Sequence, residues 1–200
     1  NRKLTGCLTD LHFAPTQTAK KALLKEGIDK DRIVITGNTV IDALLQTVNK
    51  EYVFQDNTLN QLDFQNKKII LVTAHRRENI GARMDNIFLA IKDIVENNPE
   101  TEVVIPVHLN PQVQQSAQQL LGGIERVRLI APLEYEEFVN LMDRCYLVLT
   151  DSGGLQEEAP ALGKPVLVLR DITERPEAVT AGTVKLVGTE REKIVRENTI

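Results

Sequence analysis

The sequence predicts an α/β fold with a doubly wound parallel sheet, and two observations lead to this prediction. Short runs rich in Val, Ile and Leu alternate with longer stretches of helical character. Each run is almost continuously apolar, which is typical of strands covered on both faces, because half-exposed strands alternate polar and apolar positions. The six runs are KKIILVTA, EVVIPV, RVRLIA, YLVLT, KPVLVL and TVKLVG. We therefore expect a Rossmann-like domain from about Asn66 onward.

Helices are expected between these strands. Ile87, Ile91 and Ile94 recur at helical spacing within residues 84–97. Further helices are predicted over residues 135–141 and over residues 156–162, the latter closed by Gly163 as a C-cap.

The first part of the chain follows a different pattern. LHFAP and RIVITG are predicted to be two strands around a helix over residues 18–26, with Thr16 as its N-cap. Two strands are too few for a stable sheet of their own. We therefore interpret residues 1–45 as the tail of a first Rossmann-like domain and crossover, residues 46–65 as a polar linker, and residues 66–200 as a second domain.

The C-terminal end of the sequence, like its beginning, is expected to fall within a domain. TEREKIVRENTI is predicted to form a helix that begins at Thr189 as its N-cap and stops while still amphipathic. We expect a fragment truncated at both ends, with its final helices missing.

Composition excludes several classes of function. The chain has 200 residues, 42% hydrophobic and 26% charged, with a net charge of −4. This acidic balance argues against nucleic acid and membrane surfaces as partners. No apolar run could span a bilayer and no signal peptide precedes the domain, so we expect a cytoplasmic protein. The two cysteines are not expected to form a disulfide. No metal-ligand cluster, P-loop or CxxC motif is present, so no metal or cofactor is predicted.

The strongest local signal is TDSGGLQEEAPALGKP, where a strand is followed by two glycines and a helix. Ser152, Gly153 and Gly154 can direct backbone N–H groups at an anion, and the helix dipole adds partial positive charge. The alternative is a tight turn with an ordinary N-cap. Glu157 and Glu158 occupy the first helical turn, where one carboxylate could accept hydrogen bonds from a ribose diol. The alternative for either glutamate is stabilisation of the helix dipole alone.

A second signal is TAHRREN, at the end of the first strand of the second domain. Ligands of open α/β sheets bind beyond the carboxyl ends of the strands. His75 could donate to a phosphate oxygen or transfer a proton. The alternative is a structural histidine, which is the commoner case for a lone histidine after a strand, and the adjoining arginines shift the balance toward a functional role.

Three other strand ends carry weaker signals. In IPVHLNP, His108 precedes Asn110 and Pro111, which are the expected cap and first residue of a helix. In IAPLEYEEF, Leu133 and Phe138 could clasp a flat base, although Phe138 could equally belong to the core.

DITERPEA follows the KPVLVL strand, and its Arg175 could form a bidentate contact with an anionic ligand. A solvated ion pair is the competing interpretation.

Together, HFAPT, TGNTVIDAL, HRREN, VHLNP and DSGGLQEEAPALGKPVLVLRDITERPEA resemble the non-hydrolysing UDP-N-acetylglucosamine 2-epimerases over essentially the whole chain. The resemblance implies half of a glycosyltransferase-B-like architecture with two domains. It implies interconversion of UDP-N-acetylglucosamine and UDP-N-acetylmannosamine by elimination of UDP and its re-addition through 2-acetamidoglucal, in a cytoplasmic homodimer that makes cell-envelope precursors and needs no cofactor.

The resemblance also implies roles for individual residues. His75 corresponds to the catalytic cleft histidine, Glu158 to the ribose-binding carboxylate and Arg175 to an arginine that holds UDP. Ser152, Gly153 and Gly154 correspond to the diphosphate turn. Leu133 and Phe138 correspond to the uracil pocket, and Arg76 and His108 to the site of a second, activating UDP-sugar.

The family's catalytic carboxylates would lie upstream of this chain, so we expect the fragment to be inactive alone. Three alternatives share parts of these motifs: a hydrolysing UDP-N-acetylglucosamine 2-epimerase, a sugar-nucleotide glycosyltransferase, and a non-catalytic UDP-binding module.

Overall fold

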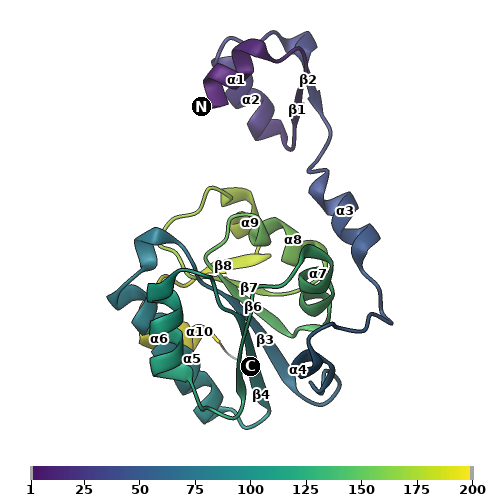
Figure 1. The fold of residues 1–200 in the computed structure, drawn as a ribbon. Helices are drawn as coiled ribbons and strands as arrows, with labels where there is room; N and C mark the ends of the chain where they lie inside the picture. Colours follow the sequence, from purple (N-terminus) through teal and green to yellow (C-terminus); the bar gives the residue numbers. More distant parts are fainter. Residues whose placement is uncertain (1, 199–200) are drawn as a thin grey trace. The chain divides into compact units, whose positions relative to one another are not determined.

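A computed structural model describes residues 2–198 of the chain. The chain divides after Gln46 into two compact units, of which the second is much the larger (Figure 1). No helix within the described residues is long and apolar enough to cross a membrane.

The first unit is a single βαβ unit with additional helices. Its strands β1 (His12–Ala14) and β2 (Ile33–Ile35) pair in parallel, as expected from LHFAP and RIVITG. The Thr16 hydroxyl accepts a hydrogen bond from the Ala19 N–H at 3.1 Å, which confirms Thr16 as the N-cap of the connecting helix. The helices are α1 (Arg2–Leu8), α2 (Gln17–Lys25), the 3₁₀ helix η1 (Lys30–Arg32) and α3 (Val40–Thr47), which continues past the division.

The second unit contains the predicted sheet. Its strands are β3 (Lys68–Thr73), β4 (Thr101–Pro106), β5 (Val127–Ile130), β6 (Leu147–Thr150), β7 (Val166–Val168) and β8 (Val184–Leu186). They lie in the order β5-β4-β3-β6-β7-β8 and every pair is parallel. This order confirms the doubly wound fold. From β3 to β5 the chain adds strands toward one edge of the sheet, and from β6 to β8 it adds them toward the other edge, so the strand order reverses between β3 and β6.

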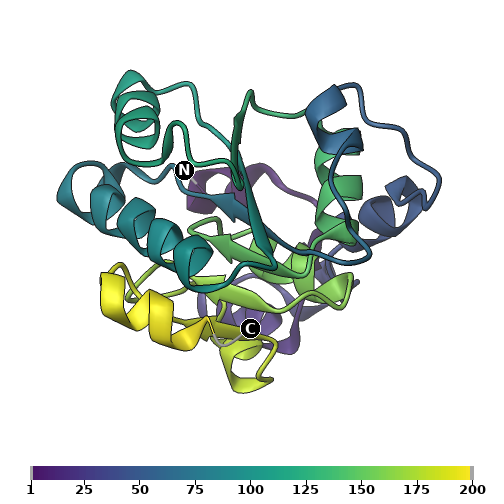
Figure 2. The ribbon, with the colours of Figure 1, turned by 90° about the horizontal axis from the view of Figure 1, so that it is seen from below.

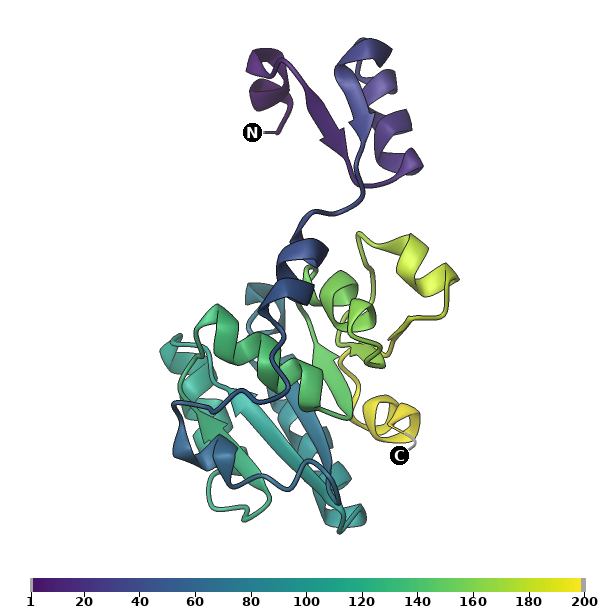
Figure 3. The same cartoon turned by 90° about the vertical axis from the view of Figure 1, so that its right-hand side faces the viewer.

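Helices cover both faces of this sheet. α5 (Ala82–Asn97), α6 (Pro111–Leu121) and α10 (Arg191–Glu197) cover one face, and α7 (Tyr135–Arg144) and α8 (Leu155–Ala161) cover the other (Figures 2 and 3). The short elements α4 (Asn57–Asn60), η2 (Arg77–Asn79) and α9 (Pro176–Thr180) lie in connections. The continuous apolar runs of the strands follow from this double coverage.

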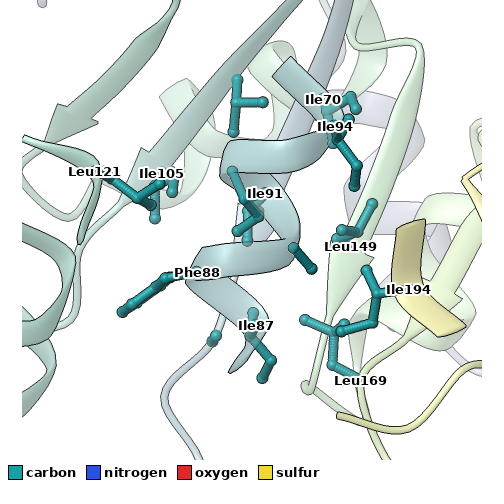
Figure 4. Close-up of a cluster of buried hydrophobic side chains, with 14 of the residues drawn as sticks. Ile70, Ile87, Phe88, Ile91, Ile94, Ile105, Leu121, Leu149, Leu169 and Ile194 are labelled. Atoms are coloured by element: carbon teal, nitrogen blue, oxygen red, sulfur yellow. The ribbon is translucent and has the colours of Figure 1, made fainter. Parts of the chain in front are cut away.

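A buried hydrophobic cluster lies between the sheet and α5. Ile87, Ile91 and Ile94 are at most 1% exposed and form the apolar stripe that the spacing predicted. Leu149 from β6 and Ile194 from α10 belong to the same cluster (Figure 4). This core fixes the strands whose carboxyl ends carry the candidate site.

The segment predicted to be a polar linker, residues 46–65, lies almost entirely in the second unit, which begins at Thr47. Phe54 is buried, and its backbone neighbours Gln55 and Asp56 donate N–H bonds to the Glu137 carboxylate on α7 at 2.8 and 3.1 Å. The Arg144 guanidinium lies 5.0 Å from the centre of the Phe54 ring. This segment is therefore packed as part of the second unit, because the Phe54 ring and the neighbouring backbone contact α7.

The cap of the last helix and the state of the two cysteines were also predicted. The last helix begins at Arg191 after Glu190 rather than after Thr189, which is buried instead of capping the helix. Both cysteines are free, as predicted, and burial raises the pKa of the Cys145 thiol to about 12.

Candidate functional site

The loops that follow β3, β6 and β7 meet at the carboxyl edge of the sheet, around one buried carboxylate. Asp151, the residue after β6, is fully buried. Its Oδ2 accepts hydrogen bonds from the His75 N–H at 3.0 Å, the Arg76 N–H at 2.9 Å and the Asn79 side-chain amide at 3.0 Å. The Asn79 amide also lies 3.4 Å from the Leu169 carbonyl, after β7. Asp151 therefore anchors the HRREN loop (residues 75–79) to the glycine turn (residues 152–154).

This anchor follows from the strand order. β3 and β6 are neighbours in register, with Thr73 opposite Thr150, and their hydroxyls are 2.7 Å apart. The next residue along β6 therefore reaches the start of the HRREN loop. From the sequence we assigned no role to Asp151, and an acidic residue directly after a buried strand was the signal that could have identified it.

His75 and His108, predicted at separate strand ends, lie together. Their rings stack with centroids 5.5 Å apart and planes 10° apart. The His75 side chain is 42% exposed, and its Nδ1 lies 3.5 Å from Asp151 Oδ1. His108 Nδ1 accepts the Asn110 N–H at 3.1 Å. Asn110 caps α6 as expected, since its side chain accepts the Gln112 N–H at 2.9 Å.

The glycine turn differs in one detail from the expected anion cradle. The Ser152 N–H donates to the Thr150 hydroxyl at 2.9 Å, so this group is already used within the protein. The N–H groups of Gly153 and Gly154 donate to no group among residues 2–198. Gly154 has φ −65° and ψ −43°, which any residue adopts. A Cβ at Gly153 would meet only Glu174 Oε2, at 3.9 Å, so glycine is not required there by the protein itself.

The two glutamates that begin α8 have different environments. Glu157 forms an ion pair with Arg175, which brings the loop after β7 to the start of α8. Burial raises the pKa of Glu158 above the ordinary carboxyl value, and the neighbouring Glu157 raises it further. Burial also raises the pKa of Tyr135, and the Glu158 charge adds to that shift, which locates the first turn of α7 near α8. Sequence reasoning did not single out Tyr135.

An ion-pair network connects Arg76 to the loop after β7. Its guanidinium lies 3.3 Å from the Glu78 carboxylate and 3.7 Å from the Glu174 carboxylate. Arg170 binds Glu174 at 2.5 Å and holds the pKa of that carboxyl at about 2. Arg76 therefore lies on the same edge of the sheet as His75.

Leu133 and Phe138 are both half-buried, Leu133 in the loop before α7 and Phe138 on the helix itself. Within residues 2–198, no group of three or more His, Cys, Asp or Glu side chains is placed to hold a metal ion.

Comparison with known proteins gives a consistent match. The family model of UDP-N-acetylglucosamine 2-epimerase matches residues 1–199. A relative from Clostridium acetobutylicum is 59% identical over 197 residues, which are 98% of this chain and 51% of the relative. The UDP-N-acetylglucosamine 2-epimerase of Escherichia coli K12 is 52% identical over 205 residues, covering 100% of this chain and 54% of that protein. The chain spans about half the length of the curated relatives it matches.

Solved structures agree with this match. The UDP-GlcNAc 2-epimerase from Neisseria meningitidis, bound to UDP-GlcNAc, has a TM-score of 0.90 and 50% identity, covering 100% of this chain and 55% of that chain. An S. aureus protein solved with UDP also has a TM-score of 0.90, at 48% identity, covering 98% of this chain and 53% of that chain. The motifs, the fold and these relatives lead to one conclusion: the chain belongs to the UDP-N-acetylglucosamine 2-epimerase family.

Proposed function

We propose that this chain supplies the UDP-holding part of a non-hydrolysing epimerase that interconverts UDP-N-acetylglucosamine and UDP-N-acetylmannosamine. In this reaction the C2 proton is removed and the C1–oxygen bond to UDP breaks, giving 2-acetamidoglucal. C2 is then reprotonated on its other face and UDP adds back at C1. UDP is therefore both leaving group and returning nucleophile, and the enzyme must stabilise its charge and retain it.

One observation carries this proposal: Asp151 joins the HRREN loop to the glycine turn between β3 and β6, where the strand order of the sheet reverses. Open α/β sheets bind nucleotides at this position. The relative from N. meningitidis carries UDP-GlcNAc, which supports a nucleotide sugar as the ligand.

The proposed roles follow the chemistry of each group. The unused N–H groups of Gly153 and Gly154 bind the diphosphate, with Ser152 shaping the turn through its bond to Thr150. His75 lies near the diphosphate and takes part in catalysis.

Arg175 binds the anionic part of UDP, and its ion pair with Glu157 holds the guanidinium beside the turn before the ligand arrives. Glu158 accepts hydrogen bonds from the ribose hydroxyls. Leu133 and Phe138 line the uracil pocket.

Arg76 and His108 are proposed to contact a second, activating UDP-sugar. Their proximity to His75, through the ring stack and the shared loop, would allow that ligand to influence the catalytic edge. We also propose that the parent enzyme is a cytoplasmic homodimer.

Calorimetric titration with UDP tests the binding role. We expect Arg175→Ala to weaken UDP binding about tenfold or more, the size of a lost charge-assisted hydrogen bond. The control is Arg191→Ala, which removes an arginine paired with Asp93 on α5, away from the glycine turn. Equal affinities of wild type and Arg175→Ala would contradict the proposed UDP site.

Activity is tested by incubating the chain with UDP-N-acetylglucosamine and following the sugar signals by NMR. We expect no conversion by this chain alone, and UDP-N-acetylmannosamine without net release of UDP from the parent enzyme. Accumulation of free UDP and N-acetylmannosamine from the parent would instead indicate the hydrolysing reaction.

A further inference from the structure

We propose that Asp151 is a positioning residue for His75, because its Oδ1 accepts a hydrogen bond from the Nδ1–H group of the imidazole. Nε2 is then the nitrogen that exchanges protons and faces the ligand. What His75 then does rests on the proposed function. Which nitrogen carries the proton does not, because it depends only on contacts within this chain.

The first step concerns the two oxygens of Asp151. Oδ2 accepts three hydrogen bonds, from the His75 N–H, the Arg76 N–H and the Asn79 amide. Oδ1 is buried and has no hydrogen-bond partner among the described residues. A buried carboxylate oxygen strongly favours having a donor, since burial has removed its water. Oδ1 therefore remains available to one further donor.

His75 can supply that donor. Its Nδ1 is 3.5 Å from Oδ1, slightly beyond a good N–H···O distance, and its side chain is 42% exposed. The His75 backbone is already tied to the same carboxylate through Oδ2. A small rotation of the ring therefore closes the remaining gap, and a proton on Nδ1 satisfies Oδ1.

The second ring of the stack provides an internal contrast. His108 Nδ1 accepts the Asn110 N–H at 3.1 Å, so a neutral His108 must carry its proton on Nε2. The structure thus predicts opposite tautomers for two histidines whose rings are stacked 5.5 Å apart.

This arrangement has a consequence for chemistry. With Nδ1–H held by Asp151, the neutral His75 ring presents a lone pair at Nε2, and the protonated ring presents an N–H there. The same atom can then accept a proton or donate to a phosphate oxygen without any ring flip. The opposite tautomer would place a lone pair against the buried carboxylate and lose that capacity.

The test is a long-range ¹H–¹⁵N NMR correlation spectrum of the chain labelled with ¹⁵N-histidine, recorded near pH ~8.5, well above the ordinary imidazole pKa. The chain has only three histidines, so the spectrum resolves each ring. We expect His75 to show a protonated Nδ1 and an unprotonated Nε2, and His108 to show the reverse. A wild-type His75 protonated at Nε2 would overturn the proposal.

Asp151→Asn sharpens the test because it keeps the shape and removes the charge. We expect the ratio of Nδ1–H to Nε2–H at His75 to fall about tenfold, the size of one hydrogen bond to a charged group, while His108 is unchanged. Asn79→Ala is the matched control, since it removes a donor to Oδ2 and leaves Oδ1 untouched. An equal tautomer change in Asn79→Ala would mean that Asp151 acts only by anchoring the loop. Loss of UDP binding with the predicted tautomers intact would contradict the proposed function alone.

Discussion

The two units share a βαβ pattern but bury it very differently. In the second unit all four residues of β6 are buried, and Val148 and Leu149 are completely inaccessible. In the first unit Phe13 on β1 is 66% exposed and Val34 on β2 is 44% exposed. Neither α1 nor α2 contains a buried residue.

This difference shows that apolar strands alone do not make a core. Six strands with helices on both faces enclose each central strand, whereas one pair of strands leaves apolar side chains open to water. Apolar burial supplies most of the stability of a fold, so the units should differ in stability and in tolerance to mutation.

Hydrogen exchange should show the largest difference between the units. We expect backbone amides of β3 and β6 to exchange on the order of 1000-fold more slowly than those of β1 and β2, because the central strands open only with the whole core. The measurement is exchange monitored by NMR. Similar protection in both sheets would refute the contrast in stability.

A pair of truncations should extend the contrast to single side chains. Leu149→Ala, at a fully buried position of β6, is expected to lower the free energy of unfolding by about 3 kcal/mol through lost burial and a cavity. Phe13→Ala, at an exposed position of β1, is expected to change it by less than about 0.5 kcal/mol. Urea denaturation measures both, and comparable losses would show that the first unit also has an effective core.

A pair of glycine substitutions should separate function from stability. The methyl group of Gly153→Ala would make only an ordinary contact, with Glu174 Oε2 at 3.9 Å, so we expect unchanged stability but roughly tenfold weaker UDP binding, about 1.4 kcal/mol, because the methyl group obstructs the diphosphate. Gly6→Ala, on α1 of the first unit, places its methyl group 3.6 Å from His12 and should leave UDP affinity unchanged. Calorimetry measures both affinities. Full-affinity binding by Gly153→Ala would exclude close approach at this turn.

The smallest expected effect concerns pH. The Arg191 guanidinium lowers the pKa of the Asp93 carboxyl, which links α10 to α5. A lowered carboxyl pKa in the folded state contributes stability above the ordinary value of about 4, and this contribution is lost as the pH falls through the lowered value.

Because Arg191 is 42% exposed, solvent screening limits the contribution to less than about 1 kcal/mol at neutral pH. Asp93→Asn should therefore be slightly less stable than wild type at pH ~7, and the difference should vanish in acid. Urea titrations at several pH values provide the measurement, and a difference that grew in acid would have the wrong sign for this pair.

Much of the candidate site could be predicted because its residues follow strands. His75, His108, Gly153 and Arg175 each follow an apolar run, and the carboxyl ends of parallel strands share one edge. The carboxylate at the centre was missed because Asp151 gains its importance from partners over 70 residues away.

The sequence by itself determined the strands, several of the helices and the family. Apolar runs predicted all six strands of the larger sheet, and local side-chain chemistry predicted the Thr16 and Asn110 caps. These signals are local, since they depend on residues within a few positions of each other.

Only the tertiary structure decided which of these residues meet. It packed residues 47–65 onto α7, stacked His75 on His108 and directed the Ser152 N–H to Thr150. It also placed the buried carboxylate of Asp151 beneath the HRREN loop. Such contacts join segments that are distant in the sequence or depend on turn geometry. They are set by strand order and by the pairing of most buried polar groups, which no short pattern records.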